Sequence, residues 1–375
     1  MELVLNEEQK FLRQAAKDFV NARSPLSRVR KLRKTGAFWS REIWKEMAEL
    51  GWLGLTIDEA HGGTALGHRY LMVVLAELGA KLVPEPIVST ALLGATAIQL
   101  GGSFELKQEH LPAMVKGDRV VALAHQERYS RFSLSAIDAT ADPAGARTWA
   151  LRGEKIHVQD GGIADYFVVT ARAPDGFALF LVPARAKGMS VQPEARLDGR
   201  SSALVRLEGV VVTEEARLGG DRGLRLLERV IDVGTAGLVA EMLGSMTAAF
   251  GMTLEHLKTR MQFDVPIGSF QVLQHRAARL FIETELARSA VMHVNGMLDE
   301  DGDAGAAVSR AVSVAKAKCS DAFMRVAHES VQMHGGIGMT DEHDIGLYLK
   351  RARVCEMTFG DSAFHRDRFA RLGGF

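Results

Sequence analysis

Apolar and polar positions change their spacing twice along this chain. Residues 1–116 and 222–375 show the period of amphipathic helices, whereas residues 117–221 form short runs rich in β-branched and aromatic residues. Because each helix buries only one face, the helices of a block need one another to form a core. The pattern predicts three domains with these boundaries, helical, β and helical, and an α+β fold class.

The first block predicts several helices that end at glycine or proline. One apolar face is expected from Leu5, Phe11, Ala15 and Phe19. Further helices are expected at residues 38–50, 69–81, 86–100 and 103–115. The tryptophans of this block are expected in its core, at Trp39, Trp44 and Trp52.

The middle block predicts a small antiparallel β-sandwich or barrel. Its β-rich runs are expected as strands at residues 120–125, 149–152, 155–158, 166–170, 177–182, 190–192 and 203–212. Turns are expected where proline, aspartate and glycine cluster, at residues 142–145 and 174–176. A change from helical to strand periodicity of this kind marks a domain boundary.

The last block predicts a bundle of four long helices. They are expected from residue 222 onward and at residues 270–295, 305–334 and 342–370. Helices of this length form a bundle whose outer faces remain available for contacts between subunits.

Composition narrows the function classes. The 375 residues carry 46 basic and 46 acidic side chains, so no net charge attracts nucleic acid or an anionic membrane. Cys319 and Cys355 are the only cysteines, which favours a reducing, cytoplasmic location. We recognise no metal-ligand spacing, no signal peptide and no run of about 18 apolar residues, so neither a metal centre nor a membrane span is expected.

The most distinctive stretch is the glycine-rich turn at residues 335–338, Gly-Gly-Ile-Gly. It follows an apolar stripe of helical spacing formed by Val312, Ala315, Cys319, Ala322 and Val326. Glycine after a last helical turn is the commonest helix stop, and this alone accounts for the segment. Glycine N–H groups also cradle phosphates that a Cβ would obstruct. Both interpretations remain open on spacing alone.

Three motifs in one order resemble those of the acyl-CoA dehydrogenases. ELGWLGLTIDEAHGG, at 49–63, resembles the family's N-terminal signature, and RMQF with PIGSFQ, within 260–271, resembles its arginine-containing segment. QMHGGIG, starting at 332, resembles the C-terminal signature, and the ending FGDSAFHR, at 359–366, resembles the branch that includes small subunits of heteromeric bacterial enzymes such as pimeloyl-CoA dehydrogenase. The resemblance spans nearly the whole chain and implies the same helical, β and four-helix-bundle fold.

The resemblance also implies a reaction, the FAD-dependent α,β-desaturation of an acyl-CoA thioester. A flavin accepts hydride from Cβ, a carboxylate takes the Cα proton, and hydrogen bonds to the thioester oxygen stabilise the enolate. The implied partners are electron-transfer flavoprotein as electron acceptor and related subunits in a homotetramer or heterotetramer. Small residues at 91–97 favour a bulky or long acyl group, such as a sterol side chain, a ring acid or a dicarboxylate, although close helix packing is the commoner reason for them.

Five residues match family positions that bind the distal half of FAD. Arg260 and Phe263 match contacts to the diphosphate and adenine, and arginine supplies planar donors that suit a diphosphate. Gln332, Gly335 and Gly336 match the segment that reaches FAD from a neighbouring subunit.

Other positions depart from the family or have open roles. Residues 125–130, HQERYS, replace the usual TEPxxGSD segment, and Gln159 replaces the threonine of the KxWIT strand. His157 replaces its tryptophan, and either lies against the isoalloxazine ring or is an ordinary strand residue. Gln271 belongs to the cofactor segment, where packing and orientation of the helix are the expected roles for it and for His275.

The catalytic base poses the main question. Phe359 occupies the position at which most of the family has glutamate, and the alternative base position, on the first helix of the last block, falls on Gly234. Asp361, two residues on, is one candidate, although its shorter side chain must close a distance that tolerates little error. Asp232 and Glu241 are weaker candidates because carboxylates at helical spacing usually pair or face a partner helix. The favoured alternative is a subunit without a base of its own, beside a glutamate-bearing partner.

Overall fold

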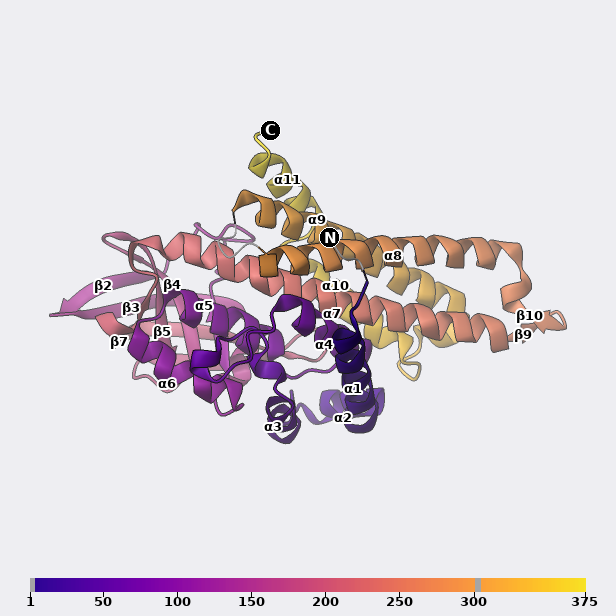
Figure 1. The fold of residues 1–375 in the computed structure, drawn as a ribbon, viewed down its shortest axis with the longest axis horizontal. Helices are drawn as coiled ribbons and strands as arrows, with labels where there is room; N and C mark the ends of the chain where they lie inside the picture. Colours follow the sequence, from indigo (N-terminus) through magenta and orange to yellow (C-terminus); the bar gives the residue numbers. More distant parts are fainter. Residues whose placement is uncertain (1–3, 301–304) are drawn as a thin grey trace. The chain divides into compact units, whose positions relative to one another are not determined.

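The computed structural model describes residues 4–300 and 305–375 (Figure 1). The chain divides into two compact units, each assembled from separate stretches of sequence. The helical unit comprises residues 1–34, 68–83 and 235–375, and the sheet unit comprises residues 35–67 and 84–234.

The sheet unit is built on an eight-stranded sheet in the order β6-β7-β3-β2-β4-β5-β8, with β1 paired to β4. The strands are β1 Val121–Ala124, β2 Thr140–Gly145, β3 Thr148–Gln159, β4 Tyr166–Ala173, β5 Gly176–Pro183, β6 Met189–Ala195, β7 Ser201–Thr213 and β8 Arg217–Leu218. Most neighbours run antiparallel, whereas β1–β4 and β2–β4 are parallel. The predicted α+β class is confirmed, and its sheet is mixed rather than purely antiparallel.

β3 joins two runs that the sequence separates. The predicted strands 149–152 and 155–158 form one strand, and its register against β7 shifts between Lys155 and Val158. Such a bulge bends a strand and redirects a side chain. One face of the sheet is apolar, with Leu151, Phe167, Phe180 and Val205 in its core.

The turn predicted at residues 142–145 is wrong. These residues belong to β2, and the turn follows at Ala146 and Arg147, where Arg147 has a φ of 54°. β2 pairs with β4 only at Thr140, so beyond that point its other edge is open. Proline lacks an N–H and is tolerated on an open edge, which explains why Pro143 fits in a strand.

Helices of the sheet unit follow the predicted pattern closely. They are α3 Arg41–Glu49, the π-helical turn Val88–Gly94, α5 Ala95–Gly101, α6 Phe104–Val115 and the start of α7 Gly223–Thr259. Ser40 and Ser103 cap α3 and α6 by accepting hydrogen bonds from backbone N–H groups. Trp44 and Trp52 are buried as predicted, and Trp39 is half-buried.

The helical unit packs α4 against α7 at unusually close range. Its helices are α1 Glu7–Arg23, α2 Leu26–Thr35, α4 His68–Ala80, the remainder of α7, α8 Gln271–Glu300, α9 Ala306–His334, α10 Ile345–Met357 and α11 Ser362–Leu372. A Cβ on Gly244 would lie 1.7 Å from the Ala76 oxygen, so only glycine permits this crossing. The Ser245 hydroxyl donates to the Gly79 oxygen at 2.8 Å across the same crossing.

Two helical predictions need correction. The helix expected at 342–370 is broken into α10 and α11, because α10 ends at Met357, Phe359 and Gly360 have positive φ angles, and Asp361 caps α11. In α1, Phe11 is 79% exposed, and the buried positions are Gln9, Ala16 and Val20. The stripe that faces α4 is therefore rotated from the one predicted.

α7 is long and apolar enough to satisfy the length and hydropathy criteria for a membrane span. Of its most apolar window, 83% is buried inside the protein. Residues 220–259 therefore form a core helix, which explains why an apolar stretch of this length occurs here.

Candidate active and cofactor-binding site

A short hairpin carries the first pair of predicted cofactor residues. β9 Met261–Gln262 and β10 Val265–Pro266 pair antiparallel around Phe263 and Asp264, whose φ angles are 53° and 63°. Two successive positive φ angles define a type I′ turn, which asparagine and glycine normally supply. Phe263 is 86% exposed and meets Phe270 edge-on at 6.1 Å between ring centroids. This turn holds an aromatic ring in solvent at some cost in backbone strain.

Arg260 and Gln271 flank this hairpin and are also exposed. The Arg260 backbone is fixed by bonds from its N–H to the His256 oxygen and from the Ile267 N–H to its own oxygen. Its guanidinium makes no hydrogen bond or ion pair with another residue in the described ranges. An arginine held by its backbone with free side-chain donors suits an anionic ligand.

The glycine-rich turn carries the second group. α9 ends at His334, and Gly335 follows with a φ of 64°. Gln332, Gly335 and Gly336 are exposed, and a Cβ at either glycine would meet no atom of another described segment within 4 Å. The turn thus stops the helix and also leaves its backbone accessible, so the two interpretations of this sequence are compatible.

Three histidines connect the hairpin and the glycine-rich turn within one protomer. The buried His334 ring lies 4.4 Å from His256, one turn before Arg260, and 4.5 Å from His343. Burial, followed by the neighbouring histidines, lowers the pKa of His334 despite a backbone bond to Ser330. Burial likewise lowers the pKa of His256. This stack of rings therefore fixes both segments at one end of the helical unit.

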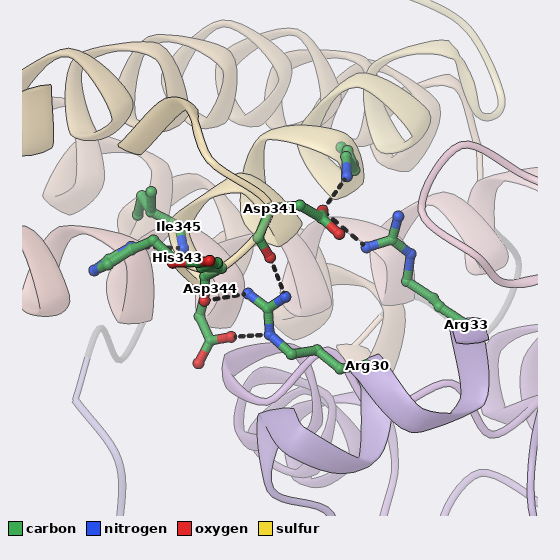
Figure 2. A network of polar contacts seen from close by, with 8 residues as sticks. Arg30, Arg33, Asp341, His343, Asp344 and Ile345 are labelled. Atoms are coloured by element: carbon green, nitrogen blue, oxygen red, sulfur yellow. Dashed lines mark hydrogen bonds and ion pairs between the residues drawn. The ribbon is translucent and has the colours of Figure 1, made fainter. Parts of the chain in front are cut away.

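α2 clamps the loop that follows this turn (Figure 2). Arg30 donates from Nε to the Asp344 carboxylate at 2.6 Å, and from its other nitrogens to the backbone oxygens of Asp341 and Glu342. Arg33 approaches the Asp341 carboxylate at 3.8 Å. Planar arginine donors match such a cluster of oxygens, so this loop is anchored at several points. This contact could not be predicted from local pattern, because Arg30 and the loop lie more than 300 residues apart in the sequence.

The sheet unit contains its own cluster of unsatisfied polar atoms. His157 lies on the β3 bulge with a φ of 52° and is exposed. Gln159 pairs in register with Ser202, and the Gln159 Oε1 and the hydroxyls of Ser201 and Ser202 are buried without a hydrogen-bond partner in the described part of the chain. Buried polar atoms normally find partners, so this cluster fits a polar ligand. Ser201 and Ser202 were missed in the sequence because serines in a strand carry no special signal.

The turn at residues 358–361 is shaped by unusual backbone. Phe359 has a φ of 59° and is half-buried, and left-handed backbone costs a non-glycine residue about 1–2 kcal/mol. The Asp361 carboxylate accepts the Phe364 N–H at 2.8 Å and caps α11. That hydrogen bond gives Asp361 a structural role, which weakens its candidacy as a base.

The other candidate carboxylates are buried. The Glu241 carboxylate lies 2.9 Å from the Arg351 Nη2, and both side chains are almost fully buried. Removing one partner of a buried ion pair is costly, so this pairing gives Glu241 a structural role. Asp232 is 2% exposed and lies on the part of α7 that belongs to the sheet unit. Gly234 offers no side chain, as the sequence indicates.

The small residues at 91–97 are used for close packing. Ala91, Ala95 and Ala97 are buried, and a Cβ on Gly94 would lie 2.7 Å from the Val121 Cβ. Their size is explained by the neighbouring strand, so they give no information about the acyl group.

Comparison with known proteins gives one family along the whole chain. The N-terminal, middle and C-terminal domains of acyl-CoA dehydrogenase match residues 6–118, 122–210 and 221–373. Acyl-CoA dehydrogenase FadE27 of Mycobacterium tuberculosis is 30% identical over 91% of this chain and 90% of its own length.

Solved structures agree. The ChsE4–ChsE5 complex from Mycobacterium tuberculosis matches with a TM-score of 0.91 and 28% identity, covering 100% of this chain and 99% of that one. A variant of the Tcur3481–Tcur3483 steroid ACAD matches with a TM-score of 0.88 and 30% identity, covering 98% of each chain. Butyryl-CoA dehydrogenase from Megasphaera elsdenii shares the fold, with a TM-score of 0.93, 24% identity and 100% of each chain covered. The chain belongs to the acyl-CoA dehydrogenase family.

Proposed function

We propose that this chain is one subunit of a heteromeric, FAD-dependent acyl-CoA dehydrogenase, and that a glutamate-bearing partner supplies the proton-abstracting carboxylate. The observation that carries the proposal is the 358–361 turn. It is fully formed, but Phe359 stands at the family's base position and the Asp361 carboxylate caps a helix. The flavin of this family accepts the hydride from the substrate Cβ.

The residues at one end of the helical unit fit the distal half of FAD. Arg260 offers free donors for a diphosphate, Phe263 offers an exposed ring for adenine, and Gly335 and Gly336 leave room for close approach. Because the histidine stack joins both segments in one protomer, we infer that a single protomer presents them together to a dinucleotide held by its neighbour. This revises the expectation that only the glycine-rich turn comes from a neighbouring subunit.

The sheet unit fits the ring half of the cofactor. Gln159, Ser201 and Ser202 bring buried polar atoms that lack protein partners, and polar edges of an isoalloxazine ring would satisfy them. His157, on the bulge beside them, presents a smaller ring than the tryptophan of relatives. We assign these residues to binding and orientation of the ring, and not to proton transfer.

Exposed apolar residues support assembly with other subunits. They lie on the hairpin, along α8 and in or just after the glycine-rich turn, at Met261, Phe263, Val272, Phe281, Ile282, Leu286, Ile337 and Met339. Apolar side chains at this density favour a protein interface. The ChsE4–ChsE5 complex and the Tcur3481–Tcur3483 steroid ACAD are each named for two proteins. A heterotetramer with a related subunit is therefore the assembly we propose.

Electron-transfer flavoprotein is the proposed electron acceptor and the cytoplasm the proposed location. One structural relative, at 27% identity, comes from a study of an electron-transferring flavoprotein of Acidaminococcus fermentans. Cys319 and Cys355 are both buried and form no disulfide in the described part of the chain, which suits a reducing compartment.

Purification with and without a glutamate-bearing partner tests the proposal. We expect the complex to be yellow and to be bleached anaerobically by an acyl-CoA, and the chain alone to show no bleaching. A chain that is yellow and bleached alone would favour the competing hypothesis, a complete homotetrameric dehydrogenase with Asp361 as base. Asp361→Asn in that preparation then decides, since loss of bleaching with FAD retained would identify Asp361 as the base.

A further inference from the structure

The end of α10 is held by a buried lysine from another helix. Lys316 of α9 is fully buried, and its Nζ donates to the Gly360 oxygen at 2.7 Å, to the Glu356 oxygen at 3.0 Å and to the Ser320 hydroxyl at 3.0 Å. Three donors and three acceptors satisfy the ammonium completely. Backbone oxygens at a helix C-terminus also carry partial negative charge, which suits a cation.

A histidine from α11 holds the same turn from its other side. The buried His365 ring contacts the Phe359 oxygen through Nε2 at 3.0 Å. Because a carbonyl only accepts, Nε2 carries the hydrogen. A Cβ on Gly360 would lie 2.4 Å from the Phe364 ring and 2.9 Å from the His365 Nε2, so the ring also enforces glycine at 360.

These contacts have a cost that requires explanation. Burial lowers the pKa of Lys316 to about 8 and that of His365 to about 3, so burying the charged form of either group reduces the free energy of unfolding. An apolar pair would satisfy the core more cheaply. What the two polar groups add is a fixed position for three backbone oxygens, at residues 356, 359 and 360, around a residue in left-handed backbone.

We propose that Lys316 and His365 are positioning residues, which lock the 358–361 turn and thereby fix the direction in which the side chain at 359 points. The inference rests on the proposed function and deepens it, since it identifies Lys316 and His365 as the residues that orient the side chain at the family's base position. In this chain both residues are present, while Phe359 stands where relatives have the carboxylate. A glutamate introduced at 359 is then delivered to a working position without any change elsewhere.

The first test measures the turn itself and needs no activity. In the protein as purified, hydrogen exchange is followed for amides 358–365 in Lys316→Met, His365→Leu and His365→Gln. We expect exchange to rise at least about tenfold in the first two, while His365→Gln, which keeps a donor, stays close to wild type. Lys318→Met is the matched control, because this neighbour pairs with Glu283 on α8. Unchanged exchange in both Lys316→Met and His365→Leu overturns the proposal, whether or not the chain binds FAD.

The second test measures whether the turn directs a side chain at position 359 toward the flavin and substrate. In the complex with its partner, Phe359→Glu is expected to add anaerobic flavin reduction by acyl-CoA, with a rising limb at the pH where the new carboxyl ionises. Adding His365→Leu is expected to lower that rate about 100-fold with FAD content and acyl-CoA affinity unchanged, and His365→Gln to restore it. Equal rates and pH profiles in all three variants overturn the positioning role. No flavin reduction above the wild-type complex in Phe359→Glu, together with the exchange result expected above, overturns the claim that the turn directs residue 359 and leaves the locked turn supported. Failure of the proposed function is a separate result, the wild-type chain being bleached without its partner.

Discussion

Two phenylalanines of this chain sit in left-handed backbone under opposite conditions. Phe263 has a φ of 53° on an exposed hairpin, and Phe359 has a φ of 59° in a turn clamped by Lys316 and His365. The hairpin ring is 86% exposed, whereas Phe359 is half-buried. Backbone strain at an exposed side chain is typical of a binding site. Backbone strain held by buried contacts is typical of a turn that positions a side chain. We call the hairpin and the glycine-rich turn the open end, because their exposed residues are available to a ligand or a subunit. We call residues 358–361 the closed turn, which has Phe359 in place of a carboxylate.

Gly360→Ala is expected to have the largest effect. Its φ of 112° disfavours a side chain, and the new Cβ would overlap the Phe364 ring, so we expect a loss of about 4 kcal/mol in unfolding free energy. Urea denaturation measures it. The matched control is Gly336→Ala in the glycine-rich turn. There the new Cβ meets no atom of residues 4–300 or 305–375 within 4 Å, its chain neighbours aside, and the change is expected to stay within about 0.5 kcal/mol. Similar losses in both variants would contradict the difference between the two regions.

Raising the pH tests the closed turn without mutating it. Burial lowers the pKa of Lys316 from 10.5 to about 8, so between these values the unfolded chain binds the extra proton. Stability conferred by this group therefore rises with pH across that window, by about 3 kcal/mol in total. The measurement is urea denaturation from pH 7.5 to 10 in wild type and Lys316→Met. Parallel curves for the two proteins would show that the lysine is not buried in charged form.

Arg260→Met addresses the open end. Loss of charge-assisted hydrogen bonds to a diphosphate is expected to weaken FAD binding about 10–100-fold, with unfolding free energy unchanged because the side chain is exposed. FAD retention after gel filtration and a titration of the apoprotein complex measure it. Arg225→Met is a control, since this arginine lies outside both candidate segments. Equal FAD affinity in wild type and Arg260→Met would remove Arg260 from the cofactor site.

Helices and strands were predicted from the sequence better than the turns and strand pairings that connect them. The helical and β blocks followed from periodicity, and the helix expected at residues 103–115 agrees with α6, which Ser103 caps. The break before Asp361 was missed, because the helical period continues on both sides of it and residues 342–370 were expected as one helix. β2 was missed because Pro143 and Gly145 are usual turn residues, and only pairing on one edge lets them form a strand.

The residues of the candidate site also fall into two groups, those recognised from motifs and those whose role depends on tertiary contacts. Arg260, Phe263 and the glycine-rich turn were recognisable as motifs, but their shared location depends on His256 meeting His334 across 78 positions of sequence. Lys316 was not recognisable at all, since lysine is almost never fully buried and an isolated one in a helix predicts a solvated face. Local pattern thus finds residues that face outward for a ligand, and misses those that act by holding backbone.

Phe263→Asn is expected to have the smallest effect and to separate the two kinds of strain. Asparagine suits a type I′ turn, so the change should raise unfolding free energy by about 1 kcal/mol, while FAD retention and assembly with a partner become weaker. Thermal unfolding and FAD content of the complex provide the two readouts. Opposite signs for stability and binding would mark the hairpin ring as kept for its ligand. A gain in stability with binding intact would instead mean that the strain at 263 serves neither cofactor nor partner.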